Sequence, residues 1–187
     1  MLVVFLSRVH LADIEKSGIP PKALASNPEP PMDDELQLCS FRLADMCYGL
    51  PLDNVVEVSR CPDVIPVPSS HPAIAGLMNI RSRIVTTLNL RVRLNLSTRE
   101  FNNEQDEHAM LVLVRDMREE LIGLQVDSIE DIITVETSQF EAAPLTLSPE
   151  LRAMIPGAYK HAQQLVMLLE LEAVLSLNTQ KPLTIGL

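Results

Sequence analysis

The sequence predicts an all-β domain that contains an internal duplication. Two observations support this interpretation. From Leu36 onward the chain consists of short apolar runs separated by turn-forming residues, and the second half of the chain repeats the pattern of the first. With 187 residues, 47% of them apolar, the chain can bury a core of ordinary size. That core must be mainly aliphatic, because the sequence contains no Trp, two Tyr and four Phe.

The first 35 residues are predicted to form a disordered tail. Residues 17–35 contain five prolines and end in an acidic run, a composition typical of linkers. The apolar run at residues 1–6 is shorter than the ~7–15 residues of a signal-peptide core. No later stretch reaches the ~20 apolar residues of a membrane span. We therefore expect a cytoplasmic protein whose folded domain spans residues 36–179.

The first half of this domain is predicted to contain five strands, at residues 36–43, 48–52, 55–58, 73–80 and 83–88. The apolar residues before and after Ser40 have opposite phases, which predicts a β-bulge near that residue. Four prolines between residues 61 and 72 indicate an extended loop or edge segment. Arg81 and Ser82 are expected to form the turn between the last two strands.

The second half is predicted to be a copy of the first. Residues 49–58 align with residues 123–132. With a second offset, Gly76 aligns with Gly157, and the apolar segment after Gly76 aligns with the leucine-rich segment after Gly157. The second half gains seven residues between these two matches, which predicts a longer loop at residues 137–149.

Each copy is expected to close with a short helix after its last strand. Asn89, a strong N-cap residue, precedes one helix, and Glu170, which gains from the helix dipole, precedes the other. The predicted barrel units are therefore residues 36–96 and 108–179, joined by a surface loop at residues 97–107.

The composition argues against nucleic-acid binding and against catalysis. The formal net charge of −10 opposes contact with a phosphate backbone. No phosphate-binding loop, dinucleotide-binding motif or nucleophile elbow is present. The histidines lie far apart and lack the spacing of metal ligands; they are His10, His71, His108 and His161. We expect no cofactor, no metal and no catalytic residue.

Two further sets of residues have simple structural interpretations. Cys39, Cys47 and Cys61 match no metal or redox motif, so we expect buried, free thiols in a reducing compartment. Asp53 and Asp127 occupy matching positions in the two copies. They could form a catalytic pair, but a turn-forming Asp after a strand accounts for both copies at once.

The basic residues cluster at Arg81, Arg83, Arg91 and Arg93. Arg83 and Arg93 are expected to lie on a solvated face. Arg81 differs, because its counterpart in the second copy is Ala162. A charge present in only one copy favours a role in binding, and the guanidinium is expected to stay in water in the free protein.

Residues 76–85, followed by Leu88-Asn89-Leu90-Arg91, resemble a signature of the CheW family of chemotaxis coupling proteins, Gly-x-x-Asn-Leu-Arg-Gly-x-x-x-Pro-x-x-Asp-Leu-Arg. Similar segments follow in the right order on both sides, at residues 41–43, 48–52, 55–58, 123–129 and 165–175. The resemblance covers about residues 36–177.

The resemblance implies two five-stranded SH3-like barrels packed together. It also implies a non-catalytic adaptor that couples the cytoplasmic tip of a chemoreceptor to a CheA-type histidine kinase, recruited to membrane receptor arrays without membrane insertion. By position, Asn79, Arg81 and the adjacent Ser82 would belong to the partner-binding surface. Val56 and Glu57 would lie on the strand that faces the receptor or the kinase.

Three departures from the family signature matter. Ser82 replaces Gly, at a cost of roughly 1 kcal/mol if its φ is positive. Thr86 replaces Pro and Asn89 replaces Asp. These changes lie at the presumed binding edge, so a divergent coupling protein of a twitching or pilus-type pathway is one alternative. A small-ligand-binding barrel and a fragment of a larger signalling protein are others; with no receiver or kinase segment present, we expect the chain to be complete.

Overall fold

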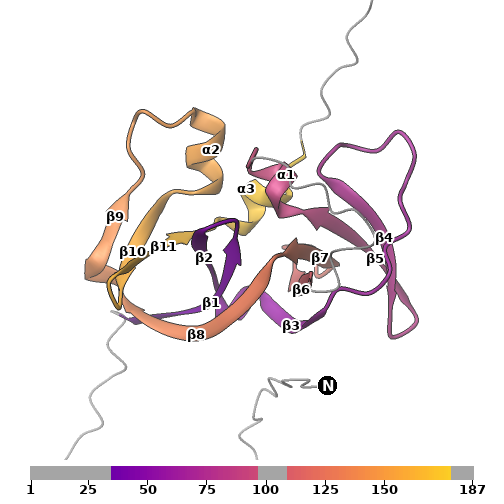
Figure 1. The fold of residues 1–187 in the computed structure, drawn as a ribbon, viewed down its shortest axis with the longest axis horizontal. Helices are drawn as coiled ribbons and strands as arrows, with labels where there is room; N and C mark the ends of the chain where they lie inside the picture. The colour runs from indigo at the N-terminus through magenta and orange to yellow at the C-terminus, as the bar shows by residue number, and fades with distance from the viewer. Residues whose placement is uncertain (1–34, 97–108, 178–187) are drawn as a thin grey trace, which may run out of the picture.

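The computed structural model describes residues 35–96 and 109–177, which form two curved β-sheets beside one another with short helices between and above them (Figure 1). Except for Glu35, the predicted tail lies outside this described part. The whole predicted surface loop at residues 97–107 lies outside it as well. The fold is all-β and consists of two SH3-like barrels packed together, which confirms the predicted class, although one of the two sheets has six strands rather than the predicted five.

The strands follow the order that the sequence predicts. In the first half they are β1 (Glu35–Leu43), β2 (Met46–Pro51), β3 (Val55–Arg60), β4 (Ile74–Ile80) and β5 (Arg83–Asn89), followed by helix α1 (Leu90–Arg93). In the second half they are β6 (Met110–Arg115), β7 (Leu121–Val126), β8 (Ser128–Glu136), β9 (Phe140–Ala142), β10 (Gly157–His161) and β11 (Gln164–Leu168). Helix α2 (Pro149–Met154) precedes β10, and helix α3 (Leu171–Leu175) follows β11. Short 3-10 helices at Leu52–Asn54 and Thr137–Gln139 precede β3 and β9.

The two barrels do not correspond to the two predicted sequence units. The first barrel has the strand order β3-β6-β7-β5-β4, and the second has the order β8-β1-β2-β11-β10-β9. Each therefore takes two strands from the other half of the chain, so residues 36–96 and 108–179 are not separate barrels as predicted. The reason is long-range pairing: β2 pairs in parallel with β11, and β7 pairs in parallel with β5.

The main hydrophobic core lies between the barrels. Apolar residues of β1, β2, β6, β7 and all three helices share one cluster, in which Phe41 stacks on Tyr48 with 6.3 Å between ring centroids. Smaller clusters fill each barrel, around Met78 and Val85 in the first and around Tyr159 and Val166 in the second. The shared core explains why two units of this size are stable together.

The duplication is visible in the backbone. The inward-facing pair Met78 and Val85 in the β4–β5 hairpin corresponds to Tyr159 and Val166 in the β10–β11 hairpin. A Cβ atom at Gly76 would lie 2.2 Å from the Ile65 carbonyl oxygen, and one at Gly157 would lie 2.3 Å from the Glu141 carbonyl oxygen. Both glycines thus allow another backbone segment to approach closely. For Gly157 that segment is β9, which lies inside the predicted long loop at residues 137–149.

Local predictions agree with the structure in detail. The register between β1 and β8 shifts between Cys39 and Phe41, which confirms the bulge at Ser40. The Asn89 side chain accepts a hydrogen bond from the Val92 N–H and caps α1, as predicted. The β1–β2 turn is shorter than the gap between the predicted strands at residues 36–43 and 48–52, because Ala44 adopts a φ of 53° and Met46 already pairs with Leu43.

Replacing Ser82 by glycine is expected to stabilise the protein by up to about 1 kcal/mol. Ser82 has a φ of 65° in the β4–β5 turn, a conformation that glycine adopts without steric cost. Urea denaturation of both proteins measures the difference. Ser59→Gly, within strand β3, is the control and should destabilise by about 0.5–1 kcal/mol. A Ser82→Gly protein no more stable than the parent would show that the turn carries no strain.

Candidate functional site

The five residues predicted to bind partners lie at the two edges of the first barrel's sheet. Val56 and Glu57 belong to the edge strand β3, Asn79 belongs to the opposite edge strand β4, and Arg81 and Ser82 form the turn after β4. We call these five residues the edge site. The register between β3 and β6 shifts at Val56, and such bulges redirect the side chains around them.

An ion pair joins the two edges. The Arg81 Nη2 atom lies 2.8 Å from the Glu57 Oε2 atom. The Arg81 side chain is 59% exposed, whereas the Glu57 side chain is only 16% exposed. The Arg81 guanidinium thus stays exposed to water, as expected, but it also pairs with Glu57 on a strand that is far from β4 in the sheet order.

The edge site continues into an apolar surface. Asn79 is exposed and pairs with Ile84 on β5, and alternation directs both side chains away from the buried Met78 and Val85. Ile84 is 78% exposed, and Ile65, which forms a bridge to Leu77 beside β4, is 70% exposed. Sequence reasoning missed both isoleucines, although Ile84 aligns with Leu165, another exposed apolar residue.

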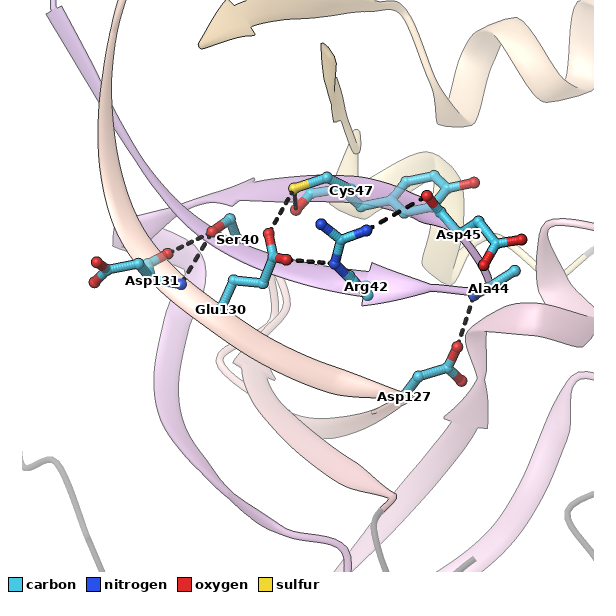
Figure 2. Close-up of polar contacts among 9 residues, drawn as sticks. Ser40, Arg42, Ala44, Asp45, Cys47, Asp127, Glu130 and Asp131 are labelled. Atoms are coloured by element: carbon cyan, nitrogen blue, oxygen red, sulfur yellow. Dashed lines mark hydrogen bonds and ion pairs between the residues drawn. The ribbon is translucent and has the colours of Figure 1, made fainter. Parts of the chain in front are cut away.

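Arg91 and Asp127 form a second polar centre, at the junction of the barrels. Arg91 is 8% exposed, and its Nε atom donates to Asp127 Oδ1 at 2.7 Å while its Nη2 atom pairs with Oδ2. Asp127 Oδ2 also accepts the Ala44 N–H, at 2.6 Å, from the β1–β2 turn (Figure 2). The structural interpretation of Asp127 is thus correct, with a buried arginine as partner that the sequence did not predict.

Asp53 has different surroundings from Asp127. It lies in the 3-10 helix before β3 and lines a surface cavity with Glu172, rather than meeting Asp127. The two carboxylates therefore serve different elements, and the alternative of an Asp53–Asp127 catalytic pair finds no support in the arrangement.

Arg93 is a structural residue, not a solvated one. Its guanidinium donates to the carbonyl oxygens of Ala173, Val174 and Ser176, at 2.8, 2.7 and 2.9 Å, and so ties α1 to the end of α3. Burial lowers the Arg93 pKa, and the nearby negative charge of Glu150 partly offsets this decrease. By contrast, Arg83 is exposed, as predicted.

The described polar groups on β1, β2 and β8 also hold structure together (Figure 2). The Arg42 guanidinium pairs with Glu130, and the Cys47 thiol donates to the other Glu130 oxygen at 3.2 Å. Burial, together with the neighbouring Glu130, raises the Cys47 pKa to about 12. The thiol is therefore protonated near neutral pH and is a poor nucleophile.

The other two thiols are protonated as well. Burial raises the pKa of Cys39 and of Cys61. All three cysteines are free; Cys39 and Cys47 are buried as predicted, and Cys61 is half-buried, with its sulfur accepting from Gln125. His71 accepts the Ala73 N–H and so shapes its own turn, while His10 and His108 lie outside the described residues.

The described part of the chain contains no helix with both the length and the apolar character needed to span a membrane.

Comparison with known proteins gives one consistent family. The sequence model of the CheW-like domain matches residues 37–178. The chemotaxis protein CheW of Treponema pallidum (strain Nichols) is 26% identical over 145 residues, which cover 77% of this chain and 84% of that protein. The chemotaxis protein CheW of Bacillus subtilis (strain 168) is 28% identical over 128 residues, covering 68% and 79%.

A solved structure shares the fold. The crystal structure of the scaffolding protein TtCheW from Thermoanaerobacter tengcongensis superposes with a TM-score of 0.67 at 22% sequence identity. The match covers 79% of this chain and 97% of that one. The two-barrel architecture is therefore that of a known scaffold.

Proposed function

Because the family model spans most of the folded region, the chain belongs to the CheW-like domain family, and from this membership we propose that it is a coupling adaptor in chemotaxis signalling. The match over residues 37–178 is the observation that carries the proposal. The protonated thiols and the structural roles of Arg91, Arg93 and Asp127 are consistent with a non-catalytic protein.

The proposed partners are a CheA-type histidine kinase and the cytoplasmic tip of a chemoreceptor. The edge site and the apolar surface beside it support this, because together they combine the Arg81–Glu57 pair with the exposed side chains of Ile65 and Ile84. Arginine beside apolar residues is typical of the centres of protein interfaces. The proposed location is the cytoplasm, with recruitment to membrane receptor arrays through these contacts.

The closest alternative differs from this proposal only in the motility system that the signalling pathway controls. A coupling protein of a twitching or pilus-type pathway would use the same fold and the same kind of contacts. A small-ligand-binding barrel is less well supported, because the relatives are chemotaxis proteins and the structure is that of a scaffold.

We expect the purified full chain to bind both partners at once. The experiment mixes it with a CheA-type kinase and a receptor fragment from the same organism and measures complex formation and kinase autophosphorylation. Coupling predicts a three-component complex in which receptor control of the kinase depends on the chain. Binding to neither partner, or a complex formed equally well without the chain, would refute the proposal.

A further inference from the structure

The duplication gives the Arg91–Asp127 centre a counterpart elsewhere in the molecule. Asp127 aligns with Asp53, and Arg91, directly after the aligned Leu90 and Leu171, corresponds to Glu172. The strand pairing agrees with this alignment. Asn89 on β5 faces Gln125 on β7, and Leu168 on β11 faces Gly49 on β2. Extending the second register by two residues places Glu170, the counterpart of Asn89, opposite Pro51, the counterpart of Gln125. Position 172 thus relates to Asp53 as position 91 relates to Asp127.

The counterpart has kept the anion and lost the cation. Asp53 and Glu172 line one cavity of about 290 Å³, together with Asp116, Glu119 and Glu170. The single cationic residue in its lining is Arg115, whose Nη1 atom pairs with Glu119 Oε2 at 2.8 Å. We call this cavity the acidic cleft.

The hairpin turn next to the cleft also has its counterpart. At the first centre, the Ala44 N–H of the β1–β2 turn donates to Asp127. At the cleft, the Met117 N–H of the β6–β7 turn donates to Glu172 Oε1 at 3.2 Å. In each site a hairpin turn therefore donates one backbone N–H to a carboxylate: to Asp127 in the first centre, and in the cleft to Glu172, which occupies the position of Arg91.

We propose that the acidic cleft binds the guanidinium of an arginine presented by a partner protein. The internal comparison supplies the ligand chemistry, because the equivalent aspartate in the other copy binds a guanidinium through two oxygens. Bidentate Asp–Arg pairs of this kind are strong and directional. A metal ion is a poorer fit, since no group of three or more His, Cys, Asp or Glu in the described residues is arranged to hold one. The assignment rests on the proposed adaptor function only in making the ligand part of a protein.

The probe is a blocked peptide, acetyl-Gly-Arg-Gly-amide, titrated into the full chain and followed by amide chemical shifts. We expect saturable shifts at residues 53, 116–119 and 170–172 that weaken as salt is added. The neutral analogue, with citrulline in place of arginine, is expected to bind at least about tenfold more weakly, because it has lost the charge. Equal binding of the two peptides would overturn the proposal, and so would tighter binding of Mg²⁺ at the same residues.

A variant of the chain itself provides the second test. Glu172→Arg would rebuild in the cleft the pair seen between Arg91 and Asp127. It is expected to raise the melting temperature by about 2–4 °C and to abolish the shifts caused by the arginine peptide. Glu136→Arg makes the same charge change on β8, outside the cleft, and should leave the shifts in place. Unchanged shifts in the Glu172→Arg protein would overturn the proposal. Because this test contains no kinase or receptor, its result is independent of whether the coupling function holds.

Discussion

Replacing Arg91 by alanine is expected to lower the free energy of unfolding by about 3 kcal/mol, the largest loss among the variants considered for stability. Arg91 is almost fully buried and holds both oxygens of Asp127. Its removal leaves a carboxylate that is 22% exposed with the Ala44 N–H as its remaining hydrogen-bond donor among the contacts described. The cost is therefore mainly that of an uncompensated, partly buried charge.

Urea denaturation of the parent and of Arg91→Ala measures this loss. Arg83→Ala removes an arginine from the exposed face of β5 and should change stability by less than ~0.5 kcal/mol. If Arg91→Ala loses less than about 1 kcal/mol, the Arg91–Asp127 pair does not hold the barrels together.

Replacing Arg81 by alanine is expected to weaken binding to a partner by about thirtyfold, which corresponds to ~2 kcal/mol. The Arg81 side chain is 59% exposed, so it can reach a partner while its ion pair with Glu57 holds it in one orientation. Because the Arg81 side of the pair lies largely in water, the loss of stability should stay near ~1 kcal/mol or below. The measurements are a titration against the kinase regulatory domain and the receptor tip, and a melt of each variant.

Glu57→Gln separates binding from architecture. This substitution breaks the ion pair but leaves the arginine in place. If Arg81 contacts the partner, Arg81→Ala should still weaken binding in the Glu57→Gln background. Non-additive losses of stability with unchanged affinity would instead mean that Arg81 serves only to join β3 to the β4–β5 turn. Arg83→Ala again serves as the control for charge.

The sequence was sufficient at several places where the structure depends on neighbours along the chain. The bulge at Ser40, the turn at Arg81 and Ser82, and the Asn89 cap follow from apolar phase and local hydrogen bonding. Helix α2 could have been recognised as well, because Ser148 caps it and Pro149 occupies its first turn. The strand exchange could not, because alternating patterns do not specify which strand pairs with which.

The polar residues show the same limit. The sequence identified Arg81 and Glu57 separately, but their ion pair depends on how the sheet curves. Arg91 and Arg93 lie two residues apart on one short helix, yet one is buried against Asp127 and the other binds the end of α3. Their roles are set by elements more than 30 residues away, at separations of 36 and 81 residues.

The exchange of strands between the halves has a consequence for how the chain acquires its structure. The β1–β8 pairing joins residues as far apart as Glu35 and Glu136, separated by 101 positions. Loops of that length close slowly, so folding should be slow for the size of the domain. During synthesis, β1 and β2 emerge long before β8 and β11, their neighbours in the sheet, and must wait with unsatisfied edges. Two fragments divided after residue 96 should each fail to fold alone, yet reconstitute the domain when mixed.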